Sequence, residues 1–215
     1  MEKIRLFFTR APGAAAAVLL SAALALGAVT QYYIDCREVR GDVLRLHVIA
    51  ASDSEADQAV KLLVRDAVLA EGADLFDGSV TADEAQQRLA PFLDRLEKAA
   101  DRVLRENGLP YAATAQLVNE YFDVRSYEGV TLPAGRYRAL KIVLGEGKGK
   151  NWWCVMFPPL CLPAATAEED AYAVFGGDGA KVVQGEPEYE IRFKIVELVE
   201  KAIERIRERR AERID

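Results

Sequence analysis

Few side chains in this sequence are of the types that perform covalent chemistry. The sequence contains a single histidine and three cysteines, namely His47, Cys36, Cys154 and Cys161. A nucleophilic cysteine needs a neighbouring base and a group that orients this base. The only such set available is Cys154 with His47, completed by Asp53 or Asn151. No local signature surrounds Cys154, and a structural, hydrogen-bonded histidine is the alternative interpretation of His47.

The two downstream cysteines suggest a disulfide rather than a metal site. Cys154 and Cys161 enclose the six residues VMFPPL, and in an oxidising compartment such a pair forms a bond. Two buried free thiols are the alternative, because cysteine packs well in apolar cores. A disulfide would remove Cys154 as a nucleophile. A metal site is not expected, since no CxxC occurs and the histidine lies far upstream. Cys36 remains unassigned.

Two polar segments resemble ligand loops but lack essential parts of the known motifs. The glycine-rich segment 145–150, GEGKGK, has no Gly-Lys-Ser/Thr ending and precedes a predicted strand. It therefore lacks the helix N-terminus of a phosphate site, and a hairpin loop is predicted instead. The acidic cluster at Asp53, Glu55 and Asp57 lacks the glycine of a calcium loop, so carboxylates in a first helical turn are expected. No cofactor or metal is predicted.

Adjacent tryptophans precede a proline pair in the segment Trp152 to Pro159. Neighbouring residues of a strand point to opposite faces, so one ring is expected in the core and the other outward. An outward tryptophan could anchor a protein partner, whereas coverage of both rings by helices is the alternative. Together with nearby loop residues this predicts a partner-binding surface, which comprises Arg125, Tyr127, Lys148, Lys150, Asn151, Trp152, Trp153, Pro158 and Pro159.

Composition indicates a folded, acidic chain. The 215 residues include 28 Lys and Arg against 34 Asp and Glu, a net charge of −6, with 51% hydrophobic residues. This length and hydrophobicity allow a well-formed core. The acidic balance argues against a general nucleic-acid binder, which needs a basic face for phosphates.

The N-terminus has the layout of an export signal. Lys3, Arg5 and Arg10 precede an uncharged run at 14–29, so residues 1–34 are predicted to be a signal peptide or a membrane anchor. Cleavage after Gly27 and retention as an anchor both remain open. The basic residues before the run place the rest of the chain outside the cytoplasm.

Residues 40–213 are predicted to form one α+β domain, a small and mostly antiparallel sheet packed by helices. Hydrophobic periodicity and turn residues predict four strands and three helices. The strands are expected at 44–50, 114–124, 136–144 and 152–157, and the helices at 55–72, 82–106 and 190–210.

Several details of these elements are also predicted. Capping boxes are expected at Ser52 and Thr81, and a bend at Pro91. The 55–72 helix is expected to bury Leu63 and expose Lys61. The segment 125–134 is predicted to be a loop and 164–187 a mobile surface excursion. The last helix carries isoleucine, leucine and valine at helical spacing, with a possible short strand at its start.

Three stretches together resemble the stage II sporulation protein R family: LRLHVIAASDSEADQAVKLLVRDAVL at 44–69, YFDVRSYEGVTLPAGRYRALKIVLGEGKGKNWWCVMFPPLC at 121–161 and YEIRFKIVELVEK at 189–201. The resemblance implies a signalling protein of endospore formers, made in the forespore and secreted into the space between the membranes of the two cells. There it would trigger a membrane-embedded protease of the aspartic type, which processes a mother-cell sigma factor precursor. The family supplies no catalytic residue, so no enzyme is expected.

The expected partners are therefore this membrane-embedded protease and, through the N-terminal segment, a membrane. Nucleic acid and a small-molecule substrate are not expected. Two other classes of function remain as alternatives: a secreted cysteine hydrolase of peptides or cell wall that uses Cys154 and His47, and a structural module that binds wall or membrane.

Overall fold

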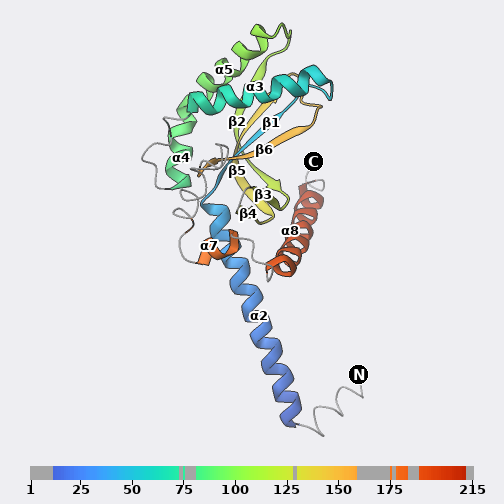
Figure 1. Ribbon diagram of the computed structural model, residues 1–215. Helices are drawn as coiled ribbons and strands as arrows, with labels where there is room; N and C mark the ends of the chain where they lie inside the picture. The colour runs from blue at the N-terminus through green and yellow to red at the C-terminus, as the bar shows by residue number, and fades with distance from the viewer. Residues whose placement is uncertain are drawn as a thin grey trace.

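The computed structural model describes residues 12–72, 75, 81–127, 130–158, 175, 178–183 and 189–211. A long N-terminal helix, α2 (Pro12–Gly41), leads into an α+β body (Figure 1). The strands are β1 (Leu44–Ile49), β2 (Ala113–Phe122), β3 (Arg125–Tyr127), β4 (Val130–Leu132), β5 (Gly135–Leu144) and β6 (Asn151–Phe157). The remaining helices are α3 (Glu55–Gly72), α4 (Ala82–Leu89), the 3-10 turn η2 (Ala90–Phe92), α5 (Leu93–Glu106), α7 (Asp178–Val183) and α8 (Tyr189–Ala211).

The main sheet has the strand order β2-β5-β1-β6. β1 pairs in parallel with β5 and antiparallel with β6, while β2 pairs antiparallel with β5. The predicted α+β class is confirmed, with one parallel pair at the centre of a mixed sheet. The expectation that 145–150 forms a hairpin loop is wrong, because β5 and β6 lie on either side of β1 and the loop crosses the end of that strand.

One face of the sheet is covered by α3, α4 and α5. Alternate strand residues such as Leu46, Leu140 and Cys154 meet buried residues of these helices in one cluster. Helix α3 is turned relative to the prediction, because Lys61 is 5% exposed and Leu63 48% exposed. The ammonium group of Lys61 donates to the Gln58 side chain at 2.6 Å and to the Lys150 carbonyl at 3.1 Å, which compensates for its burial.

The described residues cover only part of the opposite face. Residues 125–127 and 130–132 pair as the antiparallel β3–β4 hairpin, within the segment 125–134 that was predicted to be a loop. Val130 and Leu132 of this hairpin are buried against the sheet. These two strands are too short for hydrophobic periodicity to predict them. The burial of Val130 and Leu132 stabilises the strand pair. Phe175 and α7, within the segment predicted to be a mobile excursion, also pack in this second cluster; the rest of 164–187 lies outside the described residues.

Caps and breaks in the helices follow local chemistry. Ser54 rather than Ser52 caps α3, since its hydroxyl accepts the amide of Asp57 at 3.1 Å. The predicted cap at Thr81 is confirmed by the bond from the Glu84 amide. Pro91 falls within the 3-10 turn between α4 and α5, as the expected bend requires. Helix α8 begins at Tyr189, so the first residues of this segment, where a short strand was considered, are helical.

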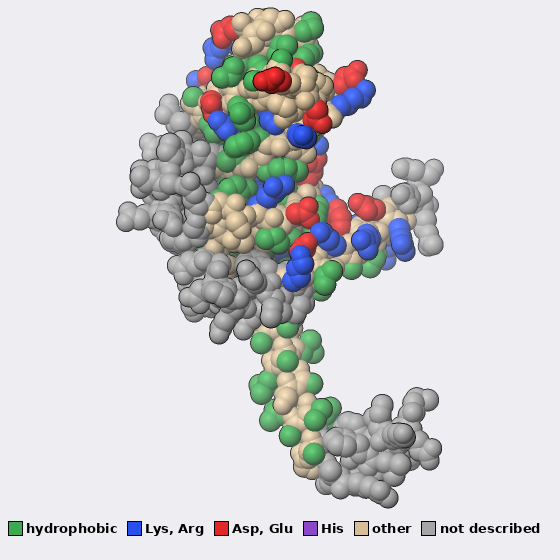
Figure 2. All heavy atoms as spheres, turned by 45° about the vertical axis from the view of Figure 1, so that its right-hand side comes forward, with side chains coloured by type: hydrophobic (Ala, Val, Ile, Leu, Met, Phe, Trp, Pro, Cys, Tyr) green, Lys and Arg blue, Asp and Glu red, His purple; other side chains and the backbone are tan. Residues whose placement is uncertain are grey.

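Helix α2 has two parts that differ in their surroundings. Described side chains between Gly13 and Gln31 are exposed, whereas Tyr32, Cys36 and Val39 are buried in the second cluster. The N-terminal part of the helix extends away from the body, and its apolar side chains are exposed (Figures 1 and 2). Among the described residues, 16–41 is the one segment long and apolar enough to cross a membrane. It indicates export or membrane anchoring, and its last turns belong to the fold.

Candidate interaction surface

The strand register separates the two residues of the hydrolase alternative. On the paired strands β1 and β6, Leu46 is opposite Cys154 and His47 is opposite Trp153. Because successive side chains alternate between faces, Cys154 lies on the helix-covered face and His47 on the other. A thiolate and its base cannot act together through a sheet. The structure therefore gives no support to a Cys154–His47 catalytic pair.

The oxidation state of Cys154 also argues against a nucleophilic thiolate at this residue. Cys154 takes part in a disulfide, and Cys36 is a free, buried thiol. A disulfide sulfur is no thiolate, so Cys154 has no nucleophile to offer. Cys161 lies outside the described residues, and its pairing with Cys154 stays a prediction.

The adjacent tryptophans point to opposite faces, as predicted. Trp152 packs at the edge of the helix-covered core, with the guanidinium of Arg65 on α3 4.5 Å from its ring. Trp153 lies on the other face, where the guanidinium of Arg125 is 5.7 Å from its ring. Both rings are half-buried. Each is thus paired with an arginine in a cation–π contact, and only the arginine beside Trp153, Arg125 of β3, also belongs to the predicted surface.

Around Trp153, side chains from five strands form a continuous patch, which we call the Trp153 surface. Its members share the face of the sheet that α3–α5 leave free: His47, Glu120, Arg125, Lys141, Asn151 and Trp153. Arg125 and Asn151 are exposed, and Glu120, Lys141 and Trp153 are half-buried. Hence this half of the face presents an aromatic ring with charged and amide groups around it.

His47 is the buried support of this patch. Its ring is stacked on Trp153 with centroids 3.9 Å apart, and Phe122 meets Trp153 edge-on at 4.8 Å. Nδ1 of His47 lies 3.4 Å from a carboxylate oxygen of Glu120, whose other oxygen accepts from Lys141 at 2.6 Å. Burial lowers the pKa of His47, although the nearby Glu120 opposes this shift. His47 is therefore a neutral imidazole, and its stacking holds the Trp153 ring in place.

Arg45, a buried cation beneath the β3–β4 hairpin, helps to position β3. Arg45 of β1 is fully buried and lies over the rings of Phe122 and Tyr137, at 4.2 and 4.9 Å. Its Nη2 donates to the hydroxyl of Tyr127 at 2.5 Å. Nε and Nη1 have no hydrogen-bond partner among the described residues. Tyr127 of the predicted set is therefore a structural contact that ties β3 to β1.

The glycine-rich loop lies at the end of the sheet that adjoins Asn151. The Lys148 amide donates to Ala51 O, and the Gly149 amide donates to Ala50 O at 2.9 Å. The Lys150 amide donates to the Asp53 side chain at 2.7 Å. These bonds fasten the loop over the β1–α3 turn and leave the side chains of Lys148 and Lys150 exposed beside the Trp153 surface.

Some predicted residues lie elsewhere. Trp152 is on the other face, and Pro158 follows Phe157, which pairs with Leu44 at the far end of β6. Pro159 is not among the described residues. Sequence reasoning missed Glu120 and Lys141, whose only signal was a charged residue within an alternating strand. Among the described residues, no group of three His, Cys, Asp or Glu could hold a metal ion.

A cavity of about 920 Å³ lies between α2, the β2–β5 edge and α8. Arginines predominate in its lining, but four of them are paired with acidic side chains, including Arg207 with Glu204. Arg40 pairs with Glu200, Arg136 with Glu204, and Arg138 with Asp83. The cavity is therefore lined by largely neutralised ion pairs.

Residues 40–167 match the family model of stage II sporulation protein R. The chain belongs to this family. Stage II sporulation protein R of Bacillus subtilis (strain 168) is 35% identical over 118 residues, which are 55% of this chain and 53% of that protein. The chain thus matches about half the length of this curated relative. No solved structure matches it.

The match to stage II sporulation protein R covers some parts of the molecule and not others. It contains the whole Trp153 surface and the glycine-rich loop, whereas most of α2 and all of α8 lie outside it. Residues involved in a role common to the family are therefore expected within 40–167, a range that includes this surface and also α3, α4 and α5.

Proposed function

We propose that this protein is an exported sporulation signal that binds a membrane-embedded protease of the aspartic type and activates it. The protease then processes the precursor of a mother-cell sigma factor. Family membership supports a role in sporulation, and α2 supports export from the forespore or anchoring in its membrane. Protein recognition, rather than bond cleavage by this chain, is the activity proposed.

The observation that carries the proposal is the Trp153 surface. A half-buried aromatic ring stacked on a second ring and flanked by an exposed arginine is typical of an interface anchor, since Trp and Arg are enriched among residues that dominate binding energy. The ring is held rigidly by His47 and Phe122, so it loses little conformational freedom on binding. Lys150, which is exposed next to Asn151, extends the surface with positive charge, whereas Lys148 forms an ion pair with Glu146.

Activation requires that this contact favour one state of the protease. A ligand shifts a population only through its greater affinity for the favoured state. The Trp153 surface is therefore proposed to contact a part of the protease on the same side of the membrane as this domain, in its active arrangement and not in its inactive one.

The two arginine–tryptophan pairs allow a matched test. The full chain and the protease are reconstituted in one membrane, and precursor cleavage is measured. Trp153→Ala and Arg125→Ala are expected to slow cleavage by about tenfold or more, consistent with a loss of at least about 1.4 kcal/mol at an interface anchor. Trp152→Ala and Arg65→Ala, the same changes on the opposite face, are expected to leave cleavage near normal. Equal effects of both pairs, with all variants folded, would refute the assignment of this surface.

A further inference from the structure

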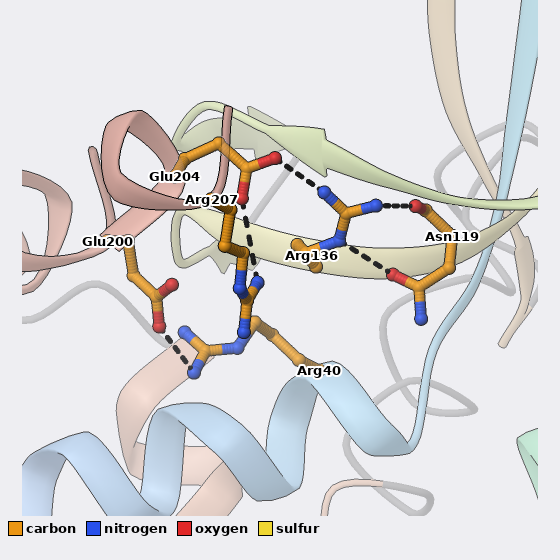
Figure 3. A network of polar contacts seen from close by, with 6 residues as sticks. All are labelled: Arg40, Asn119, Arg136, Glu200, Glu204 and Arg207. Carbon is orange, nitrogen blue, oxygen red and sulfur yellow. Dashed lines mark hydrogen bonds and ion pairs between the residues drawn. The ribbon is translucent and has the colours of Figure 1, made fainter. Parts of the chain in front are cut away.

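Helix α8 is attached to the body through its acidic face. Glu200 pairs with Arg40 of α2 at 2.9 Å, with both side chains 8% exposed, and Glu204 pairs with Arg136 of β5 at 2.5 Å (Figure 3). A surface helix normally turns its apolar stripe toward the core and its charged face toward solvent. In α8 this arrangement is only partly kept, because Val196 is buried against the body but shares that side with Glu200 and Glu204.

A second group of apolar side chains on α8 faces away from the protein. Leu198, Val199 and Ile206 are 64%, 43% and 59% exposed, and Ala202 is exposed between them. Leu198, Ala202 and Ile206 follow one another at intervals of four residues, so they lie along one side of the helix. An unpartnered stripe of this kind marks an interaction site.

Charged residues of α8 are segregated around this stripe. Arg205 follows Leu198 by seven residues, Arg209 follows Ala202 by seven, and these arginines extend the exposed face toward the C-terminus. The glutamates repeat on the other side at spacings of three and four, at 197, 200, 204 and 208. The outward face is therefore apolar and basic, which is the composition of helices that lie on anionic membranes.

The place of α8 in the fold also fits a helix that lies on a membrane. Tyr33 of α2 and Glu200 of α8 line the same cavity. Helix α8 therefore lies beside the turn of α2 at which this helix leaves the body. In Figure 2 hydrophobic side chains lie along the underside of α8, the side toward which the bare part of α2 extends, while charged side chains lie above them. Both apolar surfaces thus point to the same side of the molecule.

We propose that the outward face of α8 lies on the surface of the bilayer that α2 enters. Leu198, Ala202 and Ile206 would insert at the level of the acyl chain boundary, and the arginines would contact anionic headgroups. A second copy fits this face poorly, because no acidic side chain on it could neutralise the arginines of another α8. The inference is independent of protease activation.

Site-directed labels on the full chain test the proposal. A fluorescent probe at Ala202→Cys, in vesicles of phosphatidylcholine and phosphatidylglycerol, is compared with the same probe at Leu63→Cys, an exposed position on α3 remote from α8. Cys36 is fully buried and is expected to stay unlabelled, which the unmodified chain verifies. With brominated acyl chains, severalfold quenching is expected at position 202 and almost none at position 63.

Further variants make the outcome decisive. Leu198→Ser together with Ile206→Ser changes only exposed side chains, so α8 is expected to remain folded and the quenching at position 202 to be lost. Arg205→Gln with Arg209→Gln is expected to remove the additional quenching gained from anionic lipid. Equal quenching at positions 202 and 63 would overturn the proposal. So would protection of the probe only when a protein partner is added, or close approach of labels on two copies of the chain.

Discussion

The imidazole of His47 is stacked on the indole of Trp153, with an interplanar angle of 16°. This contact joins the central strand β1 to the edge strand β6 and fixes the half-buried indole of Trp153. The polar environment of one buried ring therefore influences the shape of the Trp153 surface.

Stability is expected to decrease in mild acid because of His47. Burial lowers the folded-state pKa below the ordinary value of 6.5, so the unfolded chain binds the proton more readily. The contribution is fully present above the ordinary pKa and is lost as the pH falls from there toward the folded-state pKa. Denaturant unfolding at about pH 7.5 and about pH 5.5 measures it. His47→Gln should show a smaller difference between the two pH values, and an unchanged difference would contradict this assignment.

Tyr127 and Arg45 are expected to be strongly coupled. Tyr127→Phe removes the acceptor of the Arg45 Nη2 bond and leaves a buried cation less satisfied, which costs about 1–3 kcal/mol. Arg45→Met replaces the guanidinium with an apolar chain in an aromatic site, and in this background Tyr127→Phe should cost much less. Urea unfolding of both single variants and the double variant gives the coupling energy. Additive effects would show that the bond contributes little.

Gly149 is expected to tolerate no side chain. A Cβ at this position would lie 2.1 Å from the backbone oxygen of Ser52, and the loop is fastened there by its own amide bonds. Gly149→Ala should lower the free energy of unfolding by about 2 kcal/mol or more through this overlap. Gly41→Ala, where no atom lies within 4 Å, is the matched control and should stay within about 0.5 kcal/mol.

The thiol of Cys36 is expected to be protected from reagents. It is fully buried where the last turns of α2 pack on the body. A water-soluble maleimide should therefore react with it only after denaturant opens the fold, as followed by mass spectrometry. Leu63→Cys should react at once in the native state. Rapid modification of Cys36 without denaturant would show that α2 detaches readily.

Local patterns predicted most elements but not their arrangement. Periodicity located β1, β2, β5 and β6 within two residues, because each strand alternates or is fully apolar. It could not place β1 between β5 and β6, since that pairing joins segments about ninety residues apart in the chain. The rotation of α3 was missed because Lys61 is stabilised by the Lys150 carbonyl, a contact absent from local sequence.

The residues that lie together around Trp153 were predicted in part for similar reasons, and their role in binding a partner stays a prediction. Arg125 and Trp153 were both proposed, and the structure brings them together. Glu120 and Lys141 were missed because isolated charges in an alternating strand look like ordinary solvent-facing residues. Trp152 was included because sequence cannot tell which of two adjacent rings faces the helices.

The central position of β1 has a consequence for biosynthesis. A ribosome makes this apolar strand early, but both of its neighbours belong to residues 135–157 and emerge much later. Until then its edges are open to aberrant pairing with other chains. The central sheet is therefore expected to assemble only after residues 135–157 have been made.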